Sequence, residues 1–259
     1  MTAQHHLTRD GVIATITIDN PTKRNALPVH VRAAMCEDLS KLMIDKTCRA
    51  IILTGAGGHF CAGGDVSSFR DNIPDRELLA LQHLFREEPR IIRLVSEGAK
   101  PVIACVEGVA AGMGMSLALC SDYVVAARTA RFTPAFARVG LLADLGLMWS
   151  LSNRVGPARA KHIISLSPTI NGEEAARMGI ADEVAHDAMA AAIAVARRYA
   201  EMPPLATAMT KLAFARGIST LESAIASEVE LQPHLSRSQD HLQAVAAFVE
   251  KRKPVYEGR

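Results

Sequence analysis

The sequence predicts an α/β fold built of repeated strand and helix units, coiled as a superhelix and not arranged as a doubly wound sheet. Short apolar runs rich in β-branched residues alternate with segments of helical periodicity. Two of these runs, about fifty residues apart, are each followed by a glycine-rich loop and a helical segment. With 259 residues, of which 49% are hydrophobic, the chain can bury a large core without disulfides.

The first unit is predicted to be a strand, a loop and a helix. Residues 11–20 (GVIATITIDN) have the composition of a strand. Residues 20–28 (NPTKRNALP) contain turn-forming residues and a proline that suits the start of a helix. Apolar side chains then recur at helical spacing, at Val31, Met35, Leu39 and Leu42.

Two similar units follow the first. Residues 50–55 (AIILTG) lead through the glycine-rich segment AGGHFCAGGD to a short helix, and a helical stretch follows Pro74. Residues 101–108 (PVIACVEG) lead through VAAGMG to another helix. A further strand is expected at 122–127 (DYVVAA).

The C-terminal part is expected to be helical. From Pro157 onward the sequence has helical character, and Ser219 and Glu222 predict a capping box. There is no low-complexity linker. We therefore expect a spiral core over residues 1–202 and a helical region over residues 203–259, which packs on the core or on a neighbouring subunit.

Charge and cysteine usage argue against several classes of protein. The net charge is +2 with both signs dispersed, so nucleic acid is not expected as a partner. An odd number of cysteines without a CxxC pair argues against a disulfide framework and against a metal site. These cysteines are Cys36, Cys48, Cys61, Cys105 and Cys120. The N-terminus is polar and lacks the apolar core of a signal peptide, so a cytoplasmic location is expected.

Residues 102–120 are about long enough for a membrane span. Glu107 lies inside this stretch, glycines crowd its centre, and it begins with the β-branched run of a short buried strand. A strand, a glycine turn and a buried helix explain the segment better, and no membrane partner is expected.

The two glycine-rich loops predict an anion site made of backbone N–H groups. Each loop places free N–H groups at a helix start, and two such donors that converge would form an oxyanion hole. For a single loop, the alternative to an anion site is that the glycines only permit a tight turn. Two loops of the same design favour the anion site. A nucleotide site is not expected. The Walker pattern is absent, and the dinucleotide fingerprint fails at Phe60 and Leu117.

Four segments, in order over nearly the whole chain, carry a family resemblance. They read NPTKRNAL, GHFCAGGDV, KPVIACVEGVAAGMGMSLALCSD and FVEKRKPVY. Together they resemble the crotonase (enoyl-CoA hydratase/isomerase) superfamily. The resemblance implies a spiral of strand–strand–helix turns and a helical C-terminal region used to form trimers, commonly paired into hexamers. It also implies an acyl-CoA thioester as substrate, with coenzyme A as part of the substrate and no separate cofactor.

By position, the resemblance also implies site residues. The N–H groups of Gly64 and Met113 would bind the thioester oxygen, and Met113 stands where the family usually has glycine. The residues that would hold the CoA part are Arg24 and Ala26 through their backbone, the loop Ala62, Gly63, Gly64, Asp65 and Val66, and Lys251, which would reach the CoA phosphates from the C-terminal region.

Both catalytic glutamates of the family's hydratases are missing. Their positions correspond here to Ser116 and Phe136. Adding water to a double bond needs groups that activate the water and deliver a proton, so a hydratase activity is expected to be weak.

One acid, Asp144, lies in the next segment. Its neighbours in FARVGLLADLGLMWSL are apolar, and burial there would raise its pKa and make it a better base. The local sequence alone also fits a helix cap, because Asp144 precedes a plausible helix. The resemblance favours a catalytic role, because the enoyl-CoA isomerases and the phenylacetyl-CoA epoxide isomerase of this superfamily place a proton-shuttling acid at this position.

The sequence therefore predicts an acyl-CoA isomerase that uses Asp144 to shift a double bond, or to carry out a ring-epoxide isomerisation, through a thioester enolate. An enoyl-CoA hydratase with weak activity and a non-catalytic acyl-CoA binder are two alternatives. A thioester hydrolase is a third, because residues 114–118 (GMSLA) are close to a nucleophile elbow around Ser116. That hydrolase would need a histidine, from His162, His186, His234 or His241.

Overall fold

Six strands form the main sheet, in the spatial order β1-β2-β3-β4-β6-β9. The computed structural model describes residues 2–65 and 77–259. β1 and β2 pair antiparallel, and every later neighbour pairs parallel, with Ile13 opposite Ala50 and Ile51 opposite Val102. The strands are β1 (Gln4–Asp10), β2 (Ile13–Asp19), β3 (Ala50–Gly55), β4 (Val102–Val106), β6 (Tyr123–Ala127) and β9 (Glu183–Ala185).

A smaller sheet lies beyond the ends of these strands. It has the order β5-β7-β8, with β5 (Val109–Ala111), β7 (Arg131–Thr133) and β8 (Ile170–Asn171). The chain passes from β4 to β5 and then into α5 (Met113–Leu119), and later from β6 to β7. These two successive turns each add one strand to each sheet, and the predicted spiral is confirmed.

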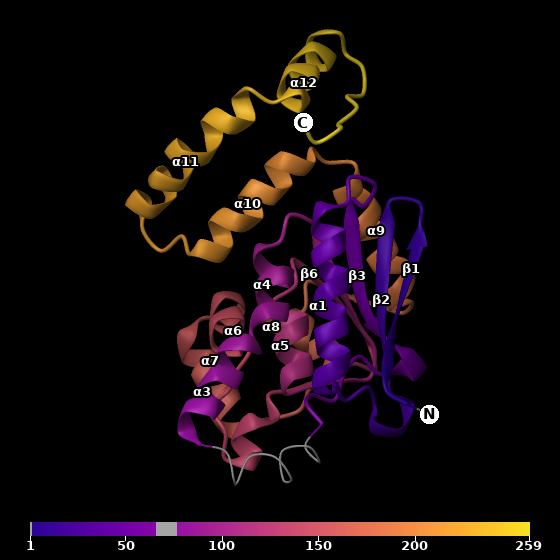
Figure 1. Cartoon of the computed structure of the whole chain (residues 1–259), viewed down its shortest axis with the longest axis vertical. Coiled ribbons are helices and arrows are strands. Elements are labelled where there is room, and N and C mark those ends of the chain that lie inside the picture. The colour runs from indigo at the N-terminus through magenta and orange to yellow at the C-terminus, as the bar shows by residue number, and fades with distance from the viewer. Residues whose placement is uncertain (1, 66–76) are drawn as a thin grey trace.

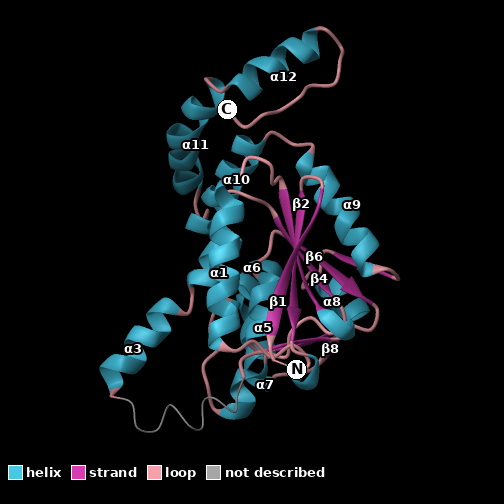
Figure 2. Ribbon diagram, turned by 45° about the vertical axis from the view of Figure 1, so that its right-hand side comes forward, coloured by secondary structure: helices cyan, strands magenta, loops and turns pink. Residues whose placement is uncertain are grey.

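The main sheet is covered on both faces. Successive residues of β3 alternate between two hydrophobic clusters: Ile51 and Leu53 face one, and Ala50 and Ile52 face the other. α1 (Val29–Ile44) packs on the first face and α9 (Ala188–Ala200) on the second (Figure 2). A strand buried on both faces reads as a continuous apolar run, which is why AIILTG was recognisable in the sequence.

The predicted helix over residues 31–42 is confirmed, because the four apolar residues expected to face the core are all buried in α1. The short helix predicted directly after Asp65 lies outside the described residues. The remaining helices are α3 (Leu78–Glu87), α4 (Arg90–Glu97), α6 (Leu147–Val155), α7 (Pro157–Leu166), α8 (Gly172–Met178), α10 (Pro204–Arg216), α11 (Leu221–Ser236) and α12 (Gln239–Val249), with short 3-10 helices η1 (Pro21–Lys23), η2 (Ala56–Gly58) and η3 (Ala135–Val139).

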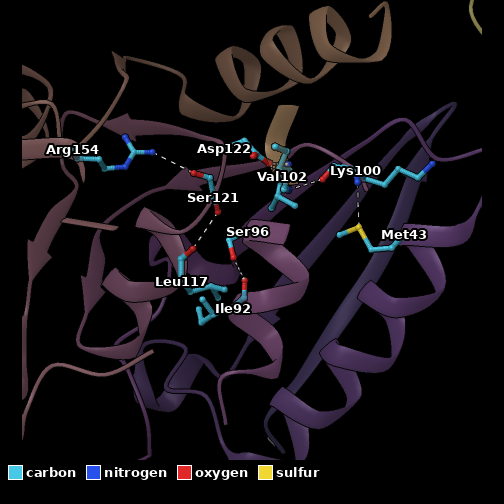
Figure 3. Close-up of polar contacts among 10 residues, drawn as sticks. Met43, Ile92, Ser96, Lys100, Val102, Leu117, Ser121, Asp122 and Arg154 are labelled. Carbon is cyan, nitrogen blue, oxygen red and sulfur yellow. Dashed lines mark hydrogen bonds and ion pairs between the residues drawn. The ribbon is translucent and has the colours of Figure 1, made fainter. Parts of the chain in front are cut away.

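The helices α10 to α12 extend from one end of the molecule (Figure 1). A buried lysine ties α10 to the sheet: Lys211 Nζ donates to Asp122 Oδ2 at 2.6 Å and to the carbonyl of Lys100 at 2.8 Å. The same Asp122 oxygen accepts from the N–H of Val102 at 2.7 Å, and Arg154 donates to the neighbouring Ser121 carbonyl (Figure 3). These bonds fix α10 to the start of β4 and β6.

Several expectations from the sequence need correction. The polar segment of β1 was missed, because its side chains are mostly exposed and show no apolar alternation. The region after Pro157 is not wholly helical, since it contains β8 and β9. The capping box is formed by Thr220 and Ser223, one residue later than expected, because the Thr220 hydroxyl accepts from the Ser223 N–H.

The apolar segment at residues 102–120 divides into β4, β5 and α5. Among the helices that the structure describes, none is both long enough and apolar enough to span a bilayer.

Candidate functional site

The two glycine-rich loops lie side by side, as the oxyanion-hole prediction requires. Cys61 accepts from the N–H of Ala111 and donates to the carbonyl of Val109, both at 2.9 Å. A Cβ added to Gly114 would lie 2.1 Å from the Cys61 carbonyl oxygen. A Cβ added to Gly63, whose φ is +107°, would lie 3.0 Å from the Ala111 oxygen and 3.7 Å from the Met113 nitrogen. Only glycine allows the backbones to approach this closely.

The predicted donors, Gly64 and Met113, both line one cavity at this junction. Met113 is the first residue of α5, and its N–H therefore has no carbonyl partner within the helix. Gly112 precedes it with φ +50° and ψ −122°, a conformation that suits glycine. Gly64 follows the strained Gly63 and pairs as an isolated bridge with Leu27. The two loops thus bring both peptide groups to the same wall.

The cavity has an empty volume of about 740 Å³, including its opening to solvent. Its lining is mostly apolar, and the acidic side chains that reach it are Glu88 and Asp144. The lining residues are Ala62, Gly63, Gly64, Phe85, Glu88, Gly112, Met113, Ala135, Phe136, Val139, Leu141 and Asp144. Such a lining suits an apolar acyl group with a polar head at the glycine loops.

Asp144 is held by its backbone, while one oxygen of its carboxylate is left without a hydrogen-bond partner. The Ser116 hydroxyl donates to the Asp144 carbonyl at 3.1 Å, and the N–H of Leu147 donates to the same oxygen at 3.1 Å. The next residue, Leu145, has φ +49°, a strained conformation for a bulky side chain. Asp144 Oδ1 is buried and has no hydrogen-bond partner. The loop therefore fixes the position of the acid and leaves this oxygen without a hydrogen bond.

Burial raises the pKa of Asp144 to about 6, in the direction that the sequence predicted. The charge of Glu88 raises the pKa further, and Arg32 opposes this effect. A carboxylate with a pKa near 6 is mostly ionised at neutral pH, yet it binds a proton more readily than an ordinary aspartate. Both properties suit a group that takes a proton and then returns it.

The helix-cap alternative for Asp144 is wrong. The N-cap of α6 is Gly146, and no side chain caps this helix. The apolar neighbours suggested burial, but only the tertiary structure shows that the carboxylate does not turn back to the helix N–H groups.

Ser116 and Phe136 are the residues at which the family resemblance implies that two glutamates are missing. Ser116 is fully buried, and its hydroxyl donates to the backbone carbonyls of Gly112 and Asp144. A nucleophile needs to be reached by a substrate and activated by a base, so this environment disfavours the thioester hydrolase. Phe136 lines the cavity.

Arg24 and Ala26 lie beside the first glycine loop. The N–H of Ala62 donates to the Arg24 carbonyl at 3.0 Å, and Arg24 itself adopts a left-handed conformation with φ +49°. Lys23 forms an ion pair with Asp65, Nζ to Oδ2, at 2.7 Å. Neither Arg24 nor Ala26 lines the cavity described above, and their contact with CoA stays a prediction. Val66 lies outside the described residues.

Lys251 is not brought to the cavity within one chain. It follows α12, at the opposite end of the molecule from α3, whose Phe85 lines the cavity (Figures 1 and 2). A contact between Lys251 and a bound CoA would need a neighbouring subunit.

Two charged residues of the site were missed from the sequence. Arg32 of α1 and Glu88, in the turn between α3 and α4, form an ion pair at 2.9 Å with side chains only 8% exposed. Arg32 also contacts the sulfur of Met113 at 3.9 Å. Nothing in the local sequence distinguishes these residues from charged surface residues on helices.

The chain is similar in sequence and structure to known proteins over nearly its whole length. The family model described as "Enoyl-CoA hydratase/isomerase" matches residues 8–259. A "Probable enoyl-CoA hydratase" of Rhodobacter capsulatus is 39% identical over 255 residues, 95% of each chain. The "1,2-epoxyphenylacetyl-CoA isomerase" of Escherichia coli is 33% identical, again over 95% of each chain. The crystal structure of a putative enoyl-CoA hydratase from Streptomyces coelicolor has a TM-score of 0.91 and 35% identity, covering 99% of this chain and 94% of that one.

Proposed function

The chain belongs to the enoyl-CoA hydratase/isomerase family, with the crotonase fold, and we propose that within this family it is an acyl-CoA isomerase with Asp144 as its single acid. The observation that carries the proposal is that Asp144, with its Oδ1 free of hydrogen bonds, lines the cavity that both glycine loops reach. We expect coenzyme A to enter as part of the substrate, without a separate cofactor.

The proposed reaction moves a double bond of a 3-enoyl-CoA toward the thioester. Asp144 takes a proton from the carbon next to the thioester, and the electron pair forms an enolate across the thioester carbonyl. The N–H groups of Gly64 and Met113 donate to the enolate oxygen. Each such donor contributes about 3 kcal/mol to a transition state. Asp144 then returns the proton to the far carbon of the former double bond, and a 2-enoyl-CoA results.

This reaction needs one acid because no water is added or removed. The related ring-epoxide isomerisation would use the same oxyanion hole. Conversion of a 3-enoyl-CoA into the conjugated 2-enoyl-CoA, followed by the absorbance of the product, is the direct test. Tight binding of the ester without any turnover would instead indicate a non-catalytic binder.

The isomerisation rate should fall at acidic pH. Asp144 must start ionised, and burial raises its pKa to about 6. We therefore expect kcat/KM to be constant between pH 7 and 8 and to decrease tenfold for each pH unit well below 6. A pH profile of kcat/KM checks this. A profile that is flat down to pH 4.5 would contradict the assignment of Asp144 as the base.

Hydration is the second candidate activity, because several relatives are named as hydratases. We expect hydration of crotonyl-CoA to be at least a hundredfold slower than isomerisation, since Ser116 and Phe136 cannot activate water and Glu88 is held in an ion pair by Arg32. Ser116→Glu should not create an efficient hydratase, because the site is fully buried and Phe136 still occupies the second position. A hydratase turnover of about ten per second or more would contradict the proposed isomerase.

A homotrimer or a hexamer is the expected assembly. α11 has no buried residue within the chain. Apolar side chains on α11 and α12 are largely exposed: Leu221, Ile225, Val229, Leu242, Val245, Phe248 and Val249. An apolar surface of this kind is typical of subunit contacts. Light scattering at micromolar concentration should give three or six times 27.8 kDa. Val229→Asp combined with Phe248→Asp should reduce this mass, whereas a monomeric wild type would contradict the prediction.

A further inference from the structure

Glu88, which lines the cavity together with Asp144, belongs to a buried ion pair with Arg32. Arg32 Nη2 donates to Glu88 Oε1 at 2.9 Å, and each side chain is 8% exposed. Glu88 lines the cavity together with Asp144 and Met113. Nη1 of Arg32 lies 3.9 Å from the sulfur of Met113. The pair thus joins α1 to the turn between α3 and α4, at the place where the oxyanion donor and the acid meet.

Stability alone does not account for this pair. Removing two charges from water is costly, and replacing a buried ion pair by apolar side chains is often neutral or stabilising. α1 already packs on the core through its apolar face, including Met35 and Leu39. The position of Glu88 in the cavity wall therefore points to a role of the pair in the site.

The charges of this pair act on Asp144. Of the charged groups in the described residues, Glu88 and Arg32 are the two that shift the pKa of Asp144, Glu88 upward and Arg32 downward. Asp144 Oδ1 is buried without a hydrogen-bond partner, although a buried guanidinium acts on it. Arg32 is bound to a residue that lines the same cavity as Asp144, and a buried guanidinium that lost its own carboxylate would need another anionic partner, because a buried charge is costly when it is unpaired.

We propose that Glu88 is a positioning residue, which holds Arg32 in an ion pair and so keeps Asp144 without a cationic partner and able to take and return a proton. This inference rests on the proposed function, since it assumes that Asp144 is the acid. In the absence of Glu88, Arg32 would bind Asp144, and a carboxylate paired with arginine is a much weaker base.

Three proteins test the proposal: the wild type, Glu88→Gln, and the double variant Arg32→Met with Glu88→Gln. Two quantities are measured on each protein. The first is the pKa of Asp144, by NMR of aspartate labelled at the side-chain carboxyl carbon, and the second is the pH profile of kcat/KM. Asp144→Asn identifies the signal. Melting temperatures show whether each variant is folded.

In Glu88→Gln we expect the pKa of Asp144 to fall from about 6 to the ordinary aspartate value of about 4 or below. The rate at neutral pH should fall at least tenfold, and the acidic decrease should move to lower pH. In the double variant the pKa should return to about 6, because burial remains and both charges are gone. The rate should recover to within about threefold of the wild type.

Recovery in the double variant distinguishes the proposal from a structural role, because that variant has lost more contacts than the single one. A pKa and a rate unchanged in Glu88→Gln would overturn the proposal, as would a double variant worse than the single. If Glu88→Gln does not fold, Glu88→Asp replaces it in the test. This variant keeps the negative charge, so the pKa of Asp144 should stay near 6. A fall of that pKa to about 4 would also overturn the proposal.

Asp144→Asn and Glu88→Gln together distinguish a failure of the proposed function from a failure of the role proposed for Glu88. A fully active Asp144→Asn would show that Asp144 is not the acid, and the proposal for Glu88 would fall with it. An inactive Asp144→Asn with an unmoved pKa in Glu88→Gln would overturn the role of Glu88 alone.

Discussion

Replacing Asp144 by Asn should reduce isomerisation of a 3-enoyl-CoA at least a hundredfold while the affinity for the CoA ester stays the same. The amide keeps the size of the side chain but cannot accept the proton. The backbone bonds from Ser116 and Leu147 to the Asp144 carbonyl do not involve the side chain, so the loop should keep its conformation. Steady-state kinetics and a binding measurement with a non-reactive acyl-CoA check both statements.

The same variant should be more stable than the wild type at pH 7. Burial raises the pKa of Asp144 to about 6, so the folded state binds this proton more tightly than the unfolded state, and stability falls as pH rises from about 4 to about 6. Removing the ionisable group should therefore raise the free energy of unfolding by about 1 to 2 kcal/mol at pH 7, and the gain should vanish below pH 4.

Asp187→Asn is the matched control for this variant. Asp187 caps α9 through a hydrogen bond to the Ala190 N–H, on the other face of the sheet, and Asn can form the same cap. Its activity should equal that of the wild type. Full activity in Asp144→Asn would show that a different group moves the proton.

Gly114→Ala should impair both stability and activity. The added Cβ would lie 2.1 Å from the Cys61 carbonyl oxygen and 2.8 Å from the Cys61 Cβ, so the two loops must separate. We expect a loss of about 3 kcal/mol in the free energy of unfolding, because overpacking a rigid contact forces the backbone to move. Displacing Met113 from the oxyanion position should lower kcat about a hundredfold or more. Denaturant titration and steady-state kinetics measure the two effects.

Gly58→Ala is a control for the glycine change itself. Gly58 has φ +73°, and no atom lies within 4 Å of its added Cβ. The left-handed conformation alone should cost about 1 kcal/mol, and activity should be unchanged. A wild-type rate in Gly114→Ala would mean that close packing of the two loops does not control catalysis.

Much of the fold could be predicted from the sequence because its signals are local. β3 and β4 are continuous apolar runs, since they are buried on both faces, and α1 shows its buried face as a helical repeat. The strands β5, β7, β8 and β9 have only two or three residues each, which is too short for a periodic pattern. They form because neighbouring turns of the spiral offer a partner backbone.

The sequence by itself determined the two glycine loops, the absence of glutamates at Ser116 and Phe136, and Asp144 as the acid available among apolar neighbours. Tertiary structure alone decided that Asp144 Oδ1 has no hydrogen-bond partner, and that Arg32 is engaged by Glu88, which lies 56 positions away. The reason is physical. Loop geometry and apolar burial depend on residue type and local order, whereas the pairing of buried charges depends on which segments the fold brings into contact.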